Sequence, residues 1–358
     1  MPRPAGARLL SLDALRGLAV FLMMEQHMGV WLYASGTREA VSSLLIGFNA
    51  LGGAAAPLFI TLAGVGTSLS LRRPGRGDGL LIRRGLVVLG FGYLLSALVP
   101  SWFTMRSWFV LHMMGVAMAT APLWRRLSTR GLIAVAAMVI AATAPLQTWL
   151  NTPRWLTNAR MALKPPFDDL AGGHLRVAFA EGQFPIFPWL SMFLVGMATG
   201  RLLAAGDRRG VRRLAIGTLV VGLTLAAIGQ FAGPFTAPWQ RVVDLPLGFF
   251  PATSAIIILL QSVVLWLVTI AAWIETRAPW ERRSAMVCLG RISLSLLLVH
   301  VVVFRELTRP VGVWQALDAT QSLAVIGLWT LLCALVAKAW QRIDYRYGAE
   351  WLLRKLAG

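Results

Sequence analysis

Long apolar stretches recur along the whole chain and are separated by short polar segments that are rich in arginine. Many of them run for about 18 residues or more, which is enough for a helix to cross a hydrocarbon core of about 30 Å. They lack the alternation of apolar and polar positions that marks a membrane β-strand. Because backbone groups in lipid must be bonded within the protein, the pattern predicts an all-α, polytopic integral membrane protein.

The pattern predicts about ten transmembrane helices in a single domain that covers residues 1–358. The expected ranges are Leu12–Tyr33, Ser43–Leu71, Gly85–Pro100, Ser107–Trp124, Gly131–Leu150, Pro185–Ala204, Ala215–Ala232, Gly248–Ile274, Met286–Phe304 and Gln321–Trp340. With the amino terminus in the cytoplasm, 22 Arg and Lys residues fall in inner segments and nine in outer segments. Cytoplasmic loops carry such an excess, so both termini are expected in the cytoplasm.

Composition agrees with a membrane protein. Hydrophobic residues make up 57% of the chain and charged residues 14%, which is too little polar surface for a soluble domain of 358 residues. A formal charge of +19 would suggest nucleic acid in a soluble chain, but here the arginines mark inner loops. No nucleic-acid partner is therefore expected. The two cysteines, Cys288 and Cys333, lie in predicted helices and indicate no disulfide framework.

Two segments need separate interpretation. The first apolar stretch is expected to be a retained helix rather than a signal peptide, because four ionisable residues interrupt it and no clear cleavage site follows. The long segment Asn151–Phe184 is expected outside the membrane, because it is polar and contains several prolines. It is longer than a connection requires, so a lid or binding surface and a passive ordered cap both fit it.

Three of the four histidines fall in predicted helices at a similar depth. His27 and His300 each lie roughly 21–22 Å above the inner end of their helix, and His112 lies roughly 8 Å below the outer surface. A neutral histidine can act as a general base near pH 7, so the three could line one catalytic site. The alternative is that each makes one hydrogen bond between helices. No ligand spacing supports a metal site, and none is expected.

Other polar residues are candidates for the same site, because ionisable groups inside membranes usually face a cavity or a partner. Glu25 lies about 200° around the first helix from His27, where it could contact a neighbouring helix. Asn49 also falls in the outer half, just before a run of small residues that permits close packing or leaves room for a substrate. The candidate substrate contacts are Asn49, Trp189 and the outer-loop His174.

Arginines at the inner helix ends are candidates for phosphate binding, since guanidinium groups bind phosphates well. Arginine at these positions is also expected in any such protein for topological reasons. Arg291 differs because it lies about one turn inside the ninth helix, beside Ser293, where snorkelling and a ligand role both fit. Asp13 and Arg16, three residues apart at the cytoplasmic end of the first helix, can pair.

Several ordered motifs resemble a family of transmembrane acyltransferases. The opening Ser11-Leu12-Asp13-Ala14-Leu15-Arg16-Gly17, followed by Glu25 and His27, resembles the D-x-x-R-G start and acidic–x–His pair of the superfamily. The segment Ala56–Ser70 resembles the P-x-F-x-F-x-x-G-x-s-x-x-L-S segment of the heparan-alpha-glucosaminide N-acetyltransferase-like family. Further matches follow in the family's order at Arg83–Leu86, Val110–Gly115, Phe187–Leu190 and Leu289–Leu294, with His300 after them.

The resemblance implies a ten-helix core that transfers an acyl group, typically acetyl, from cytoplasmic acyl-CoA to an acceptor on the far side of the membrane. The co-substrate would be acetyl-CoA or another acyl-CoA, and the acceptor a sugar-like hydroxyl or amine. The chain departs from the family at His112, where Gln is frequent, and from the family's eukaryotic members in its Glu25–His27 pair. His27 is the first choice of general base, supported by Glu25, His112 or His300. The residues expected to hold the CoA end are Arg16, Arg84, Arg201, Arg291 and Ser293.

Two functions of different classes fit these observations. One is an acyl-CoA-dependent acyltransferase of the cell inner membrane. The other is a multi-pass transporter or exporter in which the same histidines relay protons, and a structural or assembly role is a further alternative. The expected partners are the lipid bilayer, acyl-CoA and an extracytoplasmic glycan or small-molecule acceptor. The oligomeric state is left open, with a homo-oligomer among the options.

Overall fold

The computed structural model describes residues 9–34, 43–72, 77–152, 173–236, 238–245 and 252–358. These residues are mainly helical, and the pairing of Tyr33 with Leu317 is an isolated bridge among them. The chain divides into two compact units, and each is described by itself. The first comprises Met1–Phe59, Leu98–Ser101 and Ile270–Lys355, and the second comprises Ile60–Ala97, Trp102–Thr269 and Leu356–Gly358.

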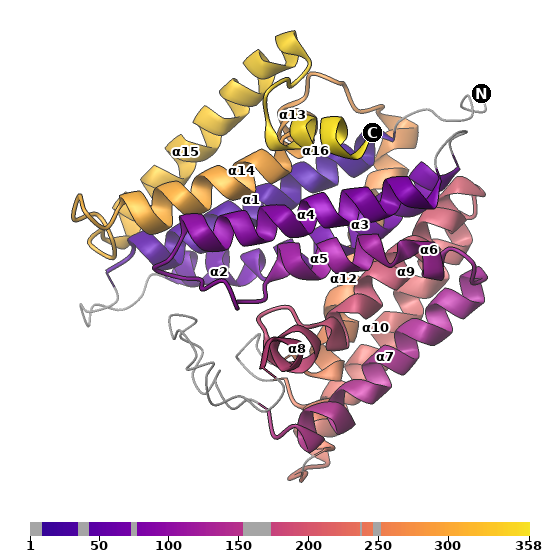
Figure 1. The fold of residues 1–358 in the computed structure, drawn as a ribbon. Helices are drawn as coiled ribbons and strands as arrows, with labels where there is room; N and C mark the ends of the chain where they lie inside the picture. The colour runs from indigo at the N-terminus through magenta and orange to yellow at the C-terminus, as the bar shows by residue number, and fades with distance from the viewer. Residues whose placement is uncertain (1–8, 35–42, 73–76, 153–172, 237, 246–251) are drawn as a thin grey trace. The chain divides into compact units, whose positions relative to one another are not determined.

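The described residues of the first unit form eight helical elements (Figure 1). They are α1 (Leu10–Leu32), α2 (Ser43–Gly52), α13 (Ala285–Arg291), α14 (Ser293–Val301), the π-helix η3 (Val302–Leu307), α15 (Ala319–Trp340), the 3-10 helix η4 (Gln341–Ile343) and most of α16 (Ala349–Ala357). Two further helices, α3 (Ala55–Leu71) and α12 (Ser254–Arg277), contribute residues to both units.

Helix α1 is the centre of the first unit, where α2, α13, α14 and α15 all pack against it (Figure 1). Glycines allow the closest of these contacts. A Cβ atom at Gly17 would meet the backbone of Met286, and one at Gly290 would meet the backbone of Asp13. The two helices therefore approach at backbone distance, as small residues permit in membrane proteins. This crossing fixes α1 against α13.

The second unit is built around α9 (Ile186–Ala204), which is buried on nearly all sides. Trp189, Met192, Phe193 and Met197 of this helix are fully buried. A helix that is apolar all round is expected inside a core. The other elements of the unit are α4 (Asp78–Leu98), α5 (Val110–Ala119), α6 (Ala121–Trp124), α7 (Thr129–Trp149), α8 (Gly173–Arg176), the π-helix η2 (Val177–Glu181), α10 (Arg208–Phe231) and α11 (Gln240–Val243).

Seven helices in the described part of the chain are long and apolar enough to cross a membrane, or eight if the bent pair of α13 with α14 and η3 is one span. Helix α1, which carries Asp13, Arg16 and Glu25, is not among the seven, and α5 is shorter. Each of the ten expected ranges contains a helix. The protein is thus an all-α, multi-pass membrane protein, while the count of ten and the orientation stay predictions.

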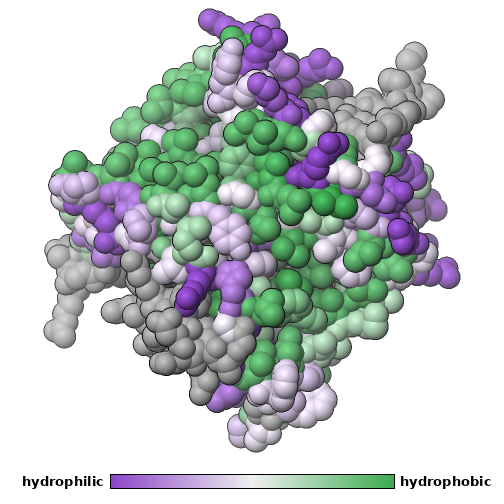
Figure 2. All heavy atoms as spheres, viewed as in Figure 1, coloured by the Kyte–Doolittle hydropathy of each residue, from purple (hydrophilic) through white to green (hydrophobic). Residues whose placement is uncertain are grey.

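The outward side chains of the apolar helices support a lipid environment. Large apolar residues on α10 and α15 are exposed, among them Val220, Leu223, Leu328 and Leu332. Figure 2 shows a hydrophobic flank along α15, with hydrophilic side chains gathered near the end of that helix. In water such a surface would be an aggregation hazard, but in a bilayer it contacts acyl chains.

The ninth expected helix, Met286–Phe304, is not continuous as the hydropathy pattern suggested. It breaks at Ile292, where α13 and the α14–η3 segment meet at 76°. The break frees backbone N–H groups at the start of α14, and a carboxylate from α16 satisfies two of them. Glu350 Oε1 accepts hydrogen bonds from the amides of Leu294 (2.5 Å) and Ser295 (3.2 Å). A distant residue thus caps a helix whose own sequence offers no cap.

Candidate active site

A pair of histidines in the first unit joins α1 to α14. His27 Nδ1 lies 2.9 Å from His300 Nε2, and the two rings are nearly parallel, with centroids 5.2 Å apart. His27 is partly exposed, whereas His300 is fully buried. Trp31, one turn beyond His27 on α1, stacks on the His27 ring at 4.8 Å. The pair therefore offers one accessible imidazole that is held in place by a buried one.

The backbone decides which nitrogen of each ring carries the proton. His300 Nδ1 lies 2.8 Å from the carbonyl oxygen of Leu296, and a carbonyl can only accept a hydrogen bond. His300 Nδ1 must therefore carry the hydrogen, and in the neutral ring its Nε2 is an acceptor. That acceptor faces His27 Nδ1, so His27 donates from Nδ1 when it is neutral. The lone pair of His27 then lies on Nε2, where a general base needs it.

Two further polar candidates of the first unit, Glu25 of α1 and Asn49 of α2, carry buried oxygen atoms. Glu25 is buried, and neither of its carboxylate oxygens has a hydrogen-bond partner among the described residues. Asn49 of α2 places its side-chain oxygen against Gly29, which lies one turn after Glu25 on the same face. That amide oxygen is also buried without a hydrogen bond in the described structure. Buried polar groups of this kind mark a candidate functional site.

Arg305 and Trp314 are neighbours of the histidine pair that the sequence did not single out. The Arg305 guanidinium lies 5.9 Å from the Trp31 ring centroid and 4.4 Å from that of Trp314. It also donates to the hydroxyl and the carbonyl of Ser101, each at 3.2 Å. In the sequence Arg305 looked like an ordinary loop cation next to a predicted helix end. Its nearness to two tryptophans on other segments could not be seen from local spacing.

His112 and His174 are brought together in the second unit by a tyrosine. The Tyr93 hydroxyl lies 3.1 Å from His174 Nε2, and the Tyr93 ring meets the His112 ring edge-on at 4.6 Å. His112 is fully buried, and its Nδ1 accepts a hydrogen bond from the amide of Phe109 at the start of α5. Since His112 belongs to the second unit, a single site containing His27, His112 and His300 stays a prediction.

The predicted outer segment Asn151–Phe184 is described only at its two ends, and residues 153–172 lie outside the described part. Near its end, Arg176 and Glu181 form a buried ion pair of 2.6 Å. Arg176 also donates to the carbonyl of Leu150, where the segment begins. These bonds tie the two described ends of the segment to one another. This ion pair anchors the described end of the segment. Such an anchor fits both a passive cap and the base of a lid.

The arginines expected to hold the CoA end have internal partners where the structure describes them. Arg16 forms an ion pair with Asp13 at 3.1 Å, as their spacing allows. Arg201 donates to the carbonyls of Arg125 and Leu127, which braces the turn before α7. Arg291 ends α13 at the break and lies 3.5 Å from Asp344.

The remaining candidates from the sequence have structural surroundings of different kinds. Arg84 lies within α4, and Ser293 begins α14 directly after the break. Trp189 is fully buried in the core of the second unit, where its ring contacts that of Phe184. Within the described residues no group of three metal-binding side chains converges.

Comparison with known proteins identifies the chain's family. The family described as heparan-alpha-glucosaminide N-acetyltransferase, catalytic, matches residues 8–233, which is well over half of the chain. The match includes His27, Glu25, Asn49 and His112, whereas His300 lies beyond it. No curated protein matches the chain. The protein is therefore a multi-pass membrane protein of acetyltransferase type, and it belongs to the heparan-alpha-glucosaminide N-acetyltransferase catalytic family.

Proposed function

We propose that the protein transfers an acetyl group from cytoplasmic acetyl-CoA to an amine or hydroxyl of a sugar-like acceptor on the outer side of the cell inner membrane. The observation that carries this proposal is the hydrogen-bonded chain from the Leu296 carbonyl through His300 to His27, in a chain of this family. It leaves a basic nitrogen on a partly exposed side chain. Acetyl-CoA is the donor used by this type of acetyltransferase.

His27 Nε2 is the proposed general base. As the acceptor nitrogen or oxygen attacks the thioester carbonyl carbon, Nε2 takes its proton. The carbon–sulfur bond then breaks, and the proton passes to the leaving sulfur to give free CoA thiol and the acetylated acceptor. His300 is a positioning residue, because it fixes the orientation and tautomer of His27 without reaching the reacting atoms. A route through a transient acetyl-His27 uses the same lone pair as nucleophile.

Glu25 and Asn49 are proposed to contact the acceptor. A carboxylate and an amide can each bind a sugar hydroxyl or amine, and both have buried oxygens without partners in the described structure. Glu25 lies two residues before His27 on α1, and the side-chain oxygen of Asn49 on α2 lies against Gly29, two residues after His27. A partner that completes their hydrogen bonds would offset the cost of burying them.

The alternative is a transporter in which the histidines relay protons. Ionisable groups inside membrane helices are typical of proton pathways, so the histidine pair by itself fits both functions. The family match favours the enzyme, because the matched family is defined by a catalytic domain. The two functions differ in their need for CoA. A transporter moves its substrate without CoA, and the enzyme consumes the thioester.

The test is transfer of labelled acetyl from acetyl-CoA to glucosamine by the purified protein in detergent. Relative to wild type, we expect His27→Ala to lower the rate by about 10²–10⁴-fold, the usual contribution of a general base. Binding of acetyl-CoA should persist in this variant, because the base lies away from the proposed CoA end. Acetylation at the wild-type rate by His27→Ala would overturn the assignment, and absence of any thioester consumption would favour the transporter.

A further inference from the structure

A basic pocket lies in the first unit where the end of α15 and η4 face the segment before α13. Its lining residues are Arg283, Lys338, Gln341 and Arg342, and its volume is about 500 Å³. Three of these four side chains are cations, and none is acidic. They come from two segments that are more than fifty residues apart in the sequence. The pocket is thus a product of the fold rather than of one run of basic residues.

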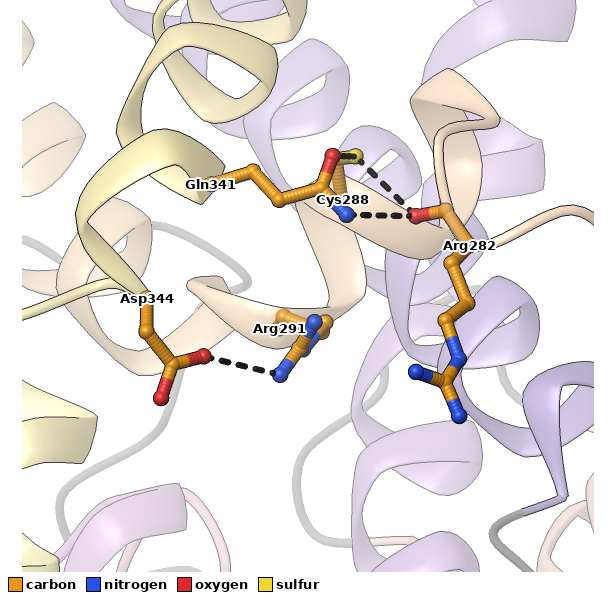
Figure 3. A network of polar contacts seen from close by, with 5 residues as sticks. All are labelled: Arg282, Cys288, Arg291, Gln341 and Asp344. Carbon is orange, nitrogen blue, oxygen red and sulfur yellow. Dashed lines mark hydrogen bonds and ion pairs between the residues drawn. The ribbon is translucent and has the colours of Figure 1, made fainter.

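A polar network holds the two walls of the pocket together (Figure 3). Gln341 Nε2 donates to the carbonyl of Arg282 at 3.2 Å, which ties η4 to the segment before α13. The thiol of Cys288 on α13 donates to the same carbonyl, at 3.6 Å. The backbone next to Arg283 and the backbone of Arg342 are therefore fixed relative to one another. Their side chains remain exposed.

The pocket cations differ from the arginines that the sequence offered for a phosphate. Arg291, beside the pocket, is bonded to Asp344 and lies 4.6 Å over the ring of Tyr345. Burial raises the pKa of the Tyr345 hydroxyl, so this residue stays neutral beneath the guanidinium. By contrast, none of the three pocket cations pairs with a carboxylate in the described structure. No ion pair within the described structure therefore offsets their positive charge.

Like charges around one hollow repel each other, and an anion between them removes that repulsion. A cleft lined by one sign of charge also concentrates counter-ions. Guanidinium groups donate in a planar fork that matches phosphate oxygens, and an ammonium adds a point charge. We propose that Arg283, Lys338 and Arg342, with Gln341 as a neutral donor or acceptor, form a phosphate-binding site.

Two sources of phosphate share this chemistry. One is the nucleotide end of acetyl-CoA, an assignment that rests on the proposed function. The other is the headgroup of an anionic lipid, which basic segments at a cytoplasmic surface attract. Arg283 and Arg342 fall in segments whose basic residues predict a cytoplasmic location, and Lys338 lies near the inner end of the tenth expected helix. Either source would reach the pocket from that side.

The experiment measures binding of adenosine 3′,5′-bisphosphate to the full chain in nanodiscs, by calorimetry. The first discs contain only zwitterionic lipid, and the second contain phosphatidylglycerol. The test variant combines Arg283→Gln, Lys338→Gln and Arg342→Gln. The control variant combines Arg209→Gln, Arg212→Gln and Arg213→Gln, which removes the same charge from exposed positions on α10. Both variants must remain monodisperse and unfold at the wild-type temperature.

We expect the bisphosphate to bind wild type and the control variant equally, and the test variant at least about tenfold more weakly. Unchanged affinity in phosphatidylglycerol discs would identify the nucleotide as the source. If phosphatidylglycerol competes with the bisphosphate, and only the test variant loses phosphatidylglycerol binding, the lipid is the source. Equal binding of both probes by the test and control variants would overturn the proposal. Bisphosphate binding is measured without acyl transfer, so this result is independent of the His27 test.

Discussion

At the scale of single residues, the hydrogen bond between His27 and His300 decides the proposed chemistry. The bond fixes the proton of His27 on Nδ1, because the Nδ1–H of His300 donates to a backbone carbonyl and leaves its Nε2 as the acceptor. The sequence placed both histidines at a similar depth, and the structure brings these two into contact. The tautomer could not be predicted, since it depends on which carbonyl lies beside His300.

Removing the buried histidine should impair catalysis through its partner. His300→Leu takes away the acceptor for His27 Nδ1, which frees the His27 ring to rotate or to change its tautomer. We expect the turnover number to fall by about 10²-fold or more, while the KM for acetyl-CoA stays within about twofold of wild type. Steady-state kinetics on the detergent-solubilised enzyme measures both. A raised KM with unchanged turnover would show that His300 serves donor binding instead.

The lone carboxyl group of Glu25 offers a second test at this scale. A buried ionisable group without a partner in the described structure lowers the stability of the fold. Natural proteins retain such groups mainly at functional sites. We expect Glu25→Gln to unfold at the same temperature as wild type or higher, and to transfer acetyl at least about tenfold more slowly. Thermal unfolding and the transfer assay are run on one preparation. Full activity combined with lower stability would make Glu25 a structural residue.

At the scale of elements, hydropathy located the helices but not their breaks or ends. Helices α4 and α10 begin several residues before the apolar ranges expected for them, because a helix continues through polar residues that leave the membrane. The N-cap of α10 is Asp207, whose side chain accepts from the amide of Gly210. The break at Ile292 escaped prediction for another reason. Its cap, Glu350, is more than fifty residues away and gives no local signal.

The crossing of α1 and α13 makes a prediction about packing. A methyl group at Gly290 would press on the backbone of Asp13, which has no flexible side-chain end to yield. We expect Gly290→Ala to destabilise the protein by about 1–3 kcal/mol, seen as a lower unfolding temperature in detergent. Gly327→Ala on α15 is the matched control, since nothing lies within 4 Å of the added atom. Equal unfolding temperatures for the two variants would mean that the helices do not meet so closely.

The Glu350 cap predicts a dependence of stability on pH. Burial raises the pKa of the Glu350 carboxyl above its usual 4.5, so the folded protein holds this proton more tightly than the unfolded chain. The stability that the proton supplies is present at low pH and is lost as pH rises through the raised pKa. Glu350→Gln keeps an acceptor for Leu294 and Ser295 without titrating. We therefore expect the unfolding temperature of Glu350→Gln to rise relative to that of wild type as the pH increases from about 4.5.

A second substitution at the same position isolates the cap itself. Glu350→Ala leaves the amides of Leu294 and Ser295 without their acceptor, so it should cost about 1–3 kcal/mol at every pH. Differential scanning calorimetry of the three proteins at several pH values compares the two effects. If Glu350→Ala and Glu350→Gln have the same stability at every pH, the side chain of Glu350 does not cap α14.

At the scale of the whole molecule, composition and motif order were enough for the class of protein and its family. The long apolar stretches of the chain predicted a helical membrane protein. The ordered motifs from Ser11 to His300 indicated the family that the comparison then identified. The site was only partly predictable. Arg305 and the pocket cations lie next to residues that are distant in the sequence. The spacing of residues along one helix cannot predict such contacts.

The central claim is that acetyl crosses the membrane from donor to acceptor with His27 as base. Its most direct test uses proteoliposomes with glucosamine sealed inside and labelled acetyl-CoA added outside, with the orientation of the protein determined by protease accessibility. We predict labelled N-acetylglucosamine in the lumen of vesicles carrying wild type, and a loss of about 10²-fold or more with His27→Ala. Labelled product that forms only when donor and acceptor share one side, or forms equally with His27→Ala, would contradict the account.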